Sequence, residues 1–190
     1  MDNGDQETRP HRRDDPEATL VRPLRHAAEP RPALRPPAHF DLDGVLGRGS
    51  YGEVYRARHR HLGRPAAIKL NADPAVDRRH RFQCEARITA RLEHPNIIPL
   101  YDADEDFMAM RLVSGRSLAE RLAGAPASAA DLPTMVEVLI QTAGAIAYAH
   151  HEGVIHRDIK AQNVVVGDHG EVQVIDWGLA VELVDGRLPD

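Results

Sequence analysis

Hydrophobic and polar residues alternate along three short stretches in the first half of the chain, at residues 40–45, 53–59 and 66–70. A period of two is typical of a β-strand that buries one face, and glycine-containing segments separate the stretches. The pattern therefore predicts three antiparallel strands.

The next stretch, residues 74–92, has the spacing of an amphipathic helix. Asp73 is a favourable N-cap, and Pro74 suits the first turn. Glu85 lies on the same stripe as the apolar residues, and a carboxylate that faces a core is costly unless a partner compensates its charge. We therefore expect a partner for Glu85. The apolar stripe consists of Phe82, Ile88 and Leu92.

Two further strands are predicted at residues 98–101 and 107–112, followed by a second helix over 132–151. A β-hairpin is predicted over 164–175, with its turn at 167–170. Strands, helix, strands, helix and hairpin in this order predict an α+β fold. The apolar stripe of the second helix consists of Leu132, Val136, Leu139, Ala143 and Ile146.

Residues 1–37 differ in composition from the rest of the chain. They hold half of the 14 prolines, equal numbers of arginine and acidic residues, and no aromatic residue. Such a segment cannot bury enough apolar surface to offset its ordering entropy. We expect a disordered tail over 1–37 and a folded domain over 38–190.

The overall composition narrows the class of protein. A net charge of −5 gives no general affinity for nucleic acid, and a single cysteine excludes an internal disulfide framework. The polar N-terminus does not resemble a secretory signal, and no run approaches the roughly 18 apolar residues of a membrane span. These features predict a cytoplasmic protein without nucleic-acid or membrane partners.

Lysine is rare in this sequence. Of 24 basic residues only Lys69 and Lys160 are lysines, so each is a candidate for a site that needs a compact ammonium group. Lys69 lies inside an apolar strand, where an unpaired ammonium would be expensive, and an ion pair with Glu85 would compensate both charges. Taken alone, the tetrapeptide A-A-I-K fits a surface lysine on an edge strand equally well.

A glycine-rich segment, G-R-G-S-Y-G at residues 47–52, joins the first two predicted strands. A dinucleotide-binding unit would require a helix after this motif, but the following residues alternate like a strand. A glycine loop between two strands can lie over phosphates, because its backbone N–H groups are unobstructed by side chains.

Charged and amide residues gather in a third segment, H-R-D-I-K-A-Q-N at residues 156–163. It follows the second amphipathic helix and precedes the apolar hairpin. A charged loop could have this composition by chance. The hairpin ends in Asp176, Trp177 and Gly178, with an apolar strand directing the carboxylate toward the interior.

Together these motifs resemble a eukaryotic-type protein kinase, of the serine/threonine kind found in bacteria. The resemblance covers residues 40–180 and places both lysines on motif positions. It implies a two-lobed fold, with a five-stranded antiparallel sheet and one helix in an N-lobe of about 38–113. The six motifs are G-R-G-S-Y-G-E-V, A-A-I-K, H-P-N-I-I, M-R-L-V-S-G-R-S-L, G-V-I-H-R-D-I-K-A-Q-N and V-I-D-W-G-L-A.

The resemblance implies that the chain binds ATP between the lobes. The glycine loop would cover the phosphates, Met110 would guard the back of the pocket, and the backbone from Arg111 to Val113 would bond to adenine. The implied phosphate-covering residues are Gly47, Gly49 and Gly52, and those enclosing adenine are Leu46, Val54, Ala67 and Val165.

The resemblance also implies the reacting groups. Lys69, held by Glu85, would contact the α- and β-phosphates, and Asn163 and Asp176 would hold Mg²⁺. Asp158 would accept the proton of the substrate hydroxyl. Lys160, two residues later, would steady the transferring phosphoryl group and is typical of serine/threonine kinases.

Three departures from the family pattern stand out. Trp177 replaces the usual phenylalanine, which we interpret as a tolerated variant, and Thr89 stands where an aliphatic residue is usual. Only 14 residues follow Asp176, without an A-P-E motif. The sequence thus predicts a chain truncated after Asp-Trp-Gly, with an incomplete C-lobe over about 114–190.

The incomplete C-lobe leaves alternatives open. A serine/threonine kinase of unknown protein substrate is favoured by the intact motifs. A non-catalytic, ATP-binding regulator of the pseudokinase kind is favoured by the missing activation segment. A non-enzymatic protein that binds through its tail is the third possibility. The apolar face of the second helix would be uncovered in this chain, which predicts self-association.

Overall fold

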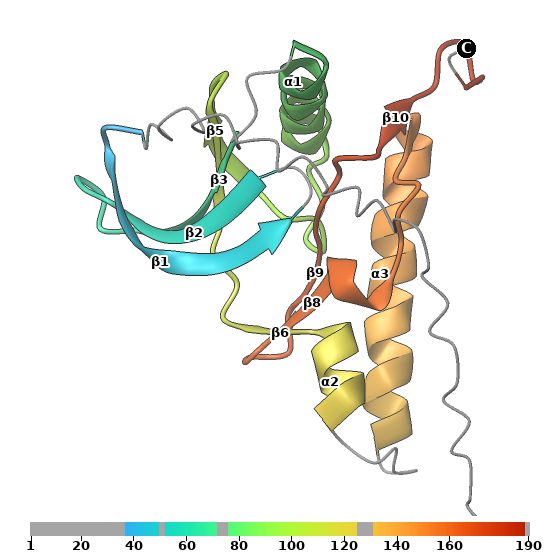
Figure 1. Cartoon of the computed structure of the whole chain (residues 1–190). Coiled ribbons are helices and arrows are strands. Elements are labelled where there is room, and N and C mark those ends of the chain that lie inside the picture. Colours follow the sequence, from blue (N-terminus) through green and yellow to red (C-terminus); the bar gives the residue numbers. More distant parts are fainter. Residues whose placement is uncertain (1–36, 50–51, 72–75, 125–130, 189–190) are drawn as a thin grey trace, which may run out of the picture. The chain divides into compact units, whose positions relative to one another are not determined.

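The computed structural model describes residues 37–49, 52–71, 76–124 and 131–188 (Figure 1). The described residues belong to one compact unit. The tail predicted over 1–37 falls outside this description except for its last residue. Asp73 and the tip of the glycine loop, Ser50 and Tyr51, also lie outside it.

A five-stranded antiparallel sheet forms the first half of the described chain, as predicted. The strand order is β1-β2-β3-β5-β4, so β3 is the central strand rather than an edge strand. Its core combines alternate residues of several strands, including Phe40, Ile68 and Phe107. The strands are β1 (Phe40–Gly49), β2 (Gly52–His59), β3 (Pro65–Leu70), β4 (Leu100–Ala103) and β5 (Phe107–Arg111).

Two strands differ from their predicted bounds by more than one residue, for physical reasons. Strand β1 continues beyond Val45 to Gly49, because irregularities in its register with β2 interrupt the alternation. Strand β4 begins at Leu100 rather than at residue 98. Ile98 is buried elsewhere, since its N–H donates to the carbonyl of Val174 in the later hairpin.

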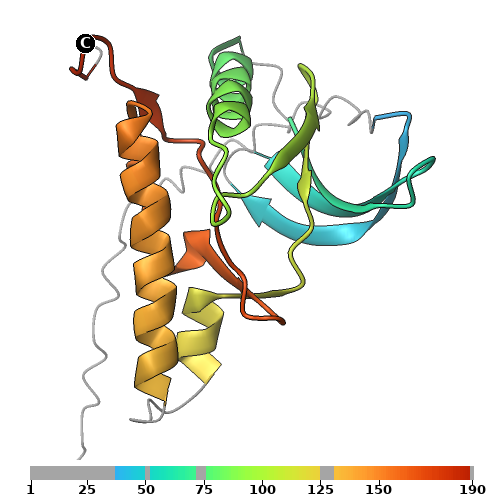
Figure 2. The same ribbon diagram turned by 180° about the vertical axis from the view of Figure 1, so that it is seen from behind.

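Helix α1 (Val76–Arg91) lies beside β4 and β5 (Figures 1 and 2). The predicted apolar stripe is confirmed, and it serves two cores. Phe82 packs with Met108 of β5, whereas Ile88 and Leu92 join a core that contains Trp177. The helix therefore bridges the sheet and the second half of the chain.

The second half contains small sheets around one long helix, α3 (Leu132–His151). Sheet β6-β8-β9 contains the predicted hairpin, and β10 pairs with β7. The other elements are β6 (Gly115–Ser117), α2 (Leu118–Gly124), β7 (Val154–Ile155), η2 (Ala161–Asn163), β8 (Val164–Gly167), β9 (Val172–Val174) and β10 (Val181–Glu182).

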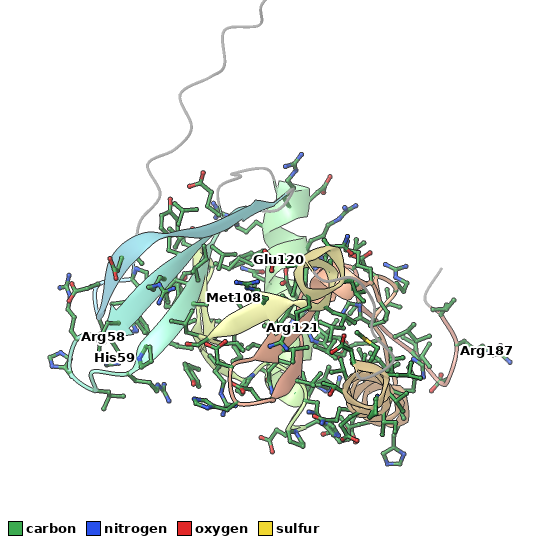
Figure 3. All side chains as sticks on the ribbon, turned by 90° about the horizontal axis from the view of Figure 1, so that it is seen from below. Arg58, His59, Met108, Glu120, Arg121 and Arg187 are labelled. Atoms are coloured by element: carbon green, nitrogen blue, oxygen red, sulfur yellow. The ribbon has the colours of Figure 1, made fainter. Side chains whose placement is uncertain are left out.

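The connection between the two halves passes through Gly115, where backbones approach closely. A Cβ atom at this position would lie 2.3 Å from the carbonyl oxygen of Val166, so only glycine fits without a shift. Helix α2 follows at once, and its Arg121 donates to the carbonyls of Val166 and Gly167 at 3.0 and 3.2 Å (Figure 3). These contacts secure β6 and α2 against β8.

Helix α3 buries one side and exposes another. Small residues such as Ala145 and Ala149 pack against Val154 and Val174. The predicted apolar stripe lies largely on the exposed side, with Leu132 and Leu139 63% and 54% exposed. The expected uncovered face is thus present.

By length and composition alone α3 could cross a membrane, a property that it shares with core helices of soluble proteins.

Candidate active site

Lys69 and Glu85 form a buried ion pair, as the sequence predicts. The Nζ atom of Lys69 on β3 lies 2.6 and 2.7 Å from the two carboxylate oxygens of Glu85 on α1. The side chains are only 10% and 6% exposed. Burial raises the pKa of Glu85 above its ordinary value, while the charge of Lys69 opposes that rise. The interpretation of Lys69 as an edge-strand surface residue is wrong.

Asp176 joins this pair as a third charged group. Its Oδ1 atom lies 3.7 Å from Nζ of Lys69, and its side chain is 42% exposed. The backbone of Asp176 has a φ of 62°, a strained value for a residue with a side chain. A Cβ atom on Gly178 would lie 3.1 Å from Glu85, so glycine lets the segment pass close to the carboxylate.

A second cluster surrounds Asp158. Lys160 donates to the Asp158 carboxylate at 2.6 Å, and the Asn163 side-chain amide donates to the same carboxylate oxygen at 3.1 Å. The hydrogen bond from Lys160 is the main reason that the pKa of Asp158 is lowered. Asn163 is buried, and its backbone carbonyl accepts from the N–H of Ile175, which precedes Asp176. Asn163 therefore connects the two clusters.

A buried ring pair lies next to both clusters. His156 and Trp177 are each 1% exposed, and their ring centroids are 4.5 Å apart. The N–H of Asp158 donates to Nδ1 of His156, so His156 Nε2 carries the proton and donates to the Ile175 carbonyl. Burial lowers the pKa of His156, which favours this neutral form.

Both residues that depart from the family pattern are buried in the structure. The Trp177 ring packs in the core with Ile88 and Leu92, as expected of a tolerated variant, but its buried indole N–H has no hydrogen-bond partner among the described residues. Thr89 is buried, and its hydroxyl donates to the Glu85 carbonyl at 2.8 Å. The polar atom of Thr89 is therefore satisfied within α1, so it adds no unpaired group to the core.

Most of the residues expected around adenine lie on neighbouring strands of the five-stranded sheet, whereas Val165 lies on β8. Ala67 is opposite Met110 in the β3–β5 register, and Val54 is opposite Lys69 in the β2–β3 register. Val113 and Val165 are half-buried, whereas Leu46 and Arg111 are exposed. Gly47 lies on β1, and Gly49 pairs with Gly52 across the β1–β2 turn.

The donor set fits Mg²⁺ better than a metal held by protein alone. Within the described ranges no group of three or more histidine, cysteine or acidic side chains could hold a metal ion. Mg²⁺ usually takes one or two protein ligands and completes its shell with phosphate and water oxygens. Asp176 and Asn163 offer a carboxylate and an amide oxygen of this kind.

Sequence reasoning missed several features of the site. The close pairing of β6 with β8, the short helix η2 and the left-handed backbone of Arg157, with φ 62°, were not predicted. A cavity of about 340 Å³ beside α1 was also missed. Helix α2 had a detectable signal, because Ser117 and Glu120 form a capping box at its start.

A sequence profile of the protein kinase domain matches residues 40–189. A probable serine/threonine-protein kinase of Streptomyces coelicolor is 38% identical over 78% of the chain, and PknH of Mycobacterium bovis is 36% identical over 78%. Aurora kinase B of Drosophila melanogaster is 31% identical over 82%. The chain spans 24%, 26% and 49% of these relatives' lengths, respectively.

Proposed function

Because the chain belongs to the protein kinase family, we propose that it transfers the γ-phosphoryl group of ATP to serine or threonine hydroxyls of a protein substrate. The observation that carries this proposal is the Lys69–Glu85 pair with Asp176 at 3.7 Å. It supports phosphoryl transfer because it presents a fixed ammonium group and a partly exposed carboxylate at one place. The relatives' names support the choice of serine and threonine.

In this proposal, the buried cluster binds the nucleotide. Glu85 holds the Lys69 ammonium in one position, from which it contacts the α- and β-phosphates. Asp176 and Asn163 would hold Mg²⁺, which would supply positive charge to neutralise the phosphates. The residues that take the adenine ring are Leu46, Val54, Ala67, Met110, Val165 and the backbone of Arg111 to Val113. Gly47, Gly49 and Gly52 cover the phosphates.

The second cluster supplies the acid–base chemistry. Asp158 orients the substrate hydroxyl and accepts its proton, and its lowered pKa keeps the carboxylate ionised before the substrate arrives. Asn163 holds the Asp158 oxygen from a buried position. Lys160 is exposed, so its ammonium can leave Asp158 and contact the transferring phosphoryl group.

The test is transfer of labelled phosphate from ATP to a generic basic protein in the presence of Mg²⁺. Lys69→Arg keeps the charge but replaces the compact ammonium by a planar fork, so transfer should fall by about 10²-fold. The matched control is Arg60→Lys, a conservative exchange in the exposed ion pair with Asp41, which should keep full activity.

The possible outcomes separate the alternatives. Label on serine or threonine, lost in Lys69→Arg only, is the result expected of a serine/threonine kinase. Equal transfer by wild type and Lys69→Arg would overturn the role of Lys69. ATP binding without any transfer would leave the non-catalytic regulator as the better account. Absence of both would favour a protein that does not use nucleotide.

A further inference from the structure

Arg91, the last residue of α1, joins three elements that are distant in sequence. One guanidinium nitrogen pairs with the carboxylate of Glu182 on β10. The other donates to the backbone carbonyl of Glu152, just after α3, at 3.2 Å. A planar fork with several donors is suited to holding two acceptors at once. Arg91 therefore links the end of α1 to β10 and to the turn that follows α3.

The linked elements carry residues of the site or lie close to them along the chain. Helix α1 carries Glu85, and β10 closely follows Asp176 along the chain. Strand β10 pairs with β7, with Glu182 opposite Val154, and β7 leads directly to His156 and Asp158. The link made by Arg91 thus spans the supports of the Lys69 pair and of the Asp158 cluster.

Packing between α1 and the segment after Asp176 is incomplete on one side. A cavity of about 340 Å³ lies there, lined among others by Arg81, Cys84, Trp177 and Leu179. Because this pocket is partly open to solvent, no side chain packed inside it opposes a tilt of the helix toward it. The position of Glu85 then depends on the packing of Phe82 against the sheet, on the core residues Ile88 and Leu92, and on the polar link at Arg91.

We propose that Arg91 and Glu182 are a pair of positioning residues, which hold α1 in the orientation where Glu85 reaches Lys69. The inference rests on the proposed function and adds a determinant of its rate. Neither residue contacts the reacting groups. Loss of the link lets α1 tilt toward the cavity, which lowers the fraction of chains with a formed Lys69–Glu85 pair.

The alternative is an ordinary surface ion pair without consequence for the site. The two side chains are 51% and 48% exposed, and exposed pairs contribute little to stability. A merely structural pair therefore predicts small changes in melting temperature and none in turnover. The pair Arg60–Asp41 has similar exposure and lies away from the site, so it serves as the matched control.

The test uses the 190-residue chain with Arg91→Ala, Glu182→Gln, the exchanged pair Arg91→Glu/Glu182→Arg, and Arg60→Ala as the control. We expect kcat to fall about two- to fivefold in both single variants, in proportion to the modest strength of an exposed pair. The KM for ATP and the melting temperature should change little. Because the exchanged pair restores the link to β10 but not the bond to the Glu152 carbonyl, it should recover part of the loss. Unchanged kcat in Arg91→Ala, or no recovery in the exchanged pair, would overturn the proposal.

Hydrogen exchange separates this proposal from the proposed function. Amides of residues 84–91 should exchange faster in Arg91→Ala and Glu182→Gln than in the wild type and in Arg60→Ala. This result would support the link even if the wild type transfers no phosphate. Identical exchange in all four proteins would overturn the link whether or not the chain is a kinase.

Discussion

The molecule contains two lysine–carboxylate pairs with the same 2.6 Å separation in very different surroundings. Lys69 and Glu85 are nine-tenths buried between β3 and α1, whereas Lys160 is 47% exposed beside Asp158. In the buried pair, loss of hydration raises the pKa of Glu85. In the exposed pair, hydrogen bonding lowers the pKa of Asp158. Burial, rather than distance, decides the direction of the shift.

The difference separates the two roles in the proposed function. A buried pair is held by its surroundings, and removing one partner leaves an uncompensated charge. Such a pair suits an invariant contact with phosphates. An exposed pair exchanges readily with water, so Lys160 can move from Asp158 to an incoming group. The sheet region is therefore the fixed part of the site and the loop region is the responsive part.

The largest expected effect is on the responsive part. Asp158→Asn removes the proton acceptor, so transfer should fall by about 10²- to 10⁴-fold. The fold should be unchanged, because the carboxamide can still accept from Lys160. Single-turnover transfer of labelled phosphate measures this. A rate within a few-fold of the wild type would show that Asp158 is not the proton acceptor.

The free energy of unfolding, in contrast to the transfer rate, should depend on the buried pair and not on the exposed one. Glu85→Ala leaves the Lys69 ammonium buried without its partner, which should lower the free energy of unfolding by about 3 kcal/mol. Lys160→Ala removes a partner at the surface, and its unfolding curve should overlay that of the wild type. Urea denaturation compares the two variants. Equal losses would mean that the two pairs do not differ as their burial indicates.

The pH dependence of stability should have opposite signs in the two regions. Since the folded state raises the pKa of Glu85 above 4.5, the contribution of Glu85 is complete below that pH and declines as the pH rises through the folded value. Asp158 has a pKa lowered from 3.8, so its contribution is present above that pH and is lost as the pH falls through the folded value.

Unfolding curves of the wild type, Glu85→Gln and Asp158→Asn across the acid range measure the contribution of each carboxyl group to the free energy of unfolding. Relative to that of the wild type, the free energy of unfolding of Glu85→Gln should increase as the pH rises above 4.5. The difference in the free energy of unfolding between Asp158→Asn and the wild type should change only below pH 3.8. Parallel curves for all three proteins would contradict the opposite signs.

The smallest effect concerns a region outside both pairs, the exposed face of α3. We propose that the chain self-associates through this face, because Leu139 and Ile140 are more than half exposed. Leu139→Gln with Ile140→Gln should shift the molecular mass in light scattering toward that of a monomer, with transfer activity unchanged. A wild type that is monomeric at every concentration would exclude the association.

Much of the fixed region was predictable from sequence. The alternation of residues 66–70 and the helical stripe around Glu85 together imply the ion pair, because each charge would otherwise be buried without compensation. Packing then determined what the pattern left open. Helix α3 is apolar on more than one side, so its periodicity alone does not tell which side contacts Val154 and Val174.

The responsive region was less predictable, because its geometry depends on tertiary contacts. The motif that contains Asp158 and Lys160 suggested their chemistry but not their mutual hydrogen bond. The positive φ value of Arg157 has no signal in residue type, whereas Asp176 belongs to a type that adopts such values more often than most. The Arg91–Glu182 link joins residues 91 positions apart, which no local pattern indicates.

The most direct test of the account is a calorimetric titration of ATP with Mg²⁺ into Asp158→Asn and Asp176→Asn, beside the wild type. The account assigns Asp158 to the substrate hydroxyl and Asp176 to the metal. Asp158→Asn should therefore bind with nearly the wild-type affinity, and Asp176→Asn should lose most of its Mg²⁺-dependent binding. Equal losses of affinity in the two variants would contradict the division of the site into a fixed, nucleotide-binding part and a responsive, reacting part.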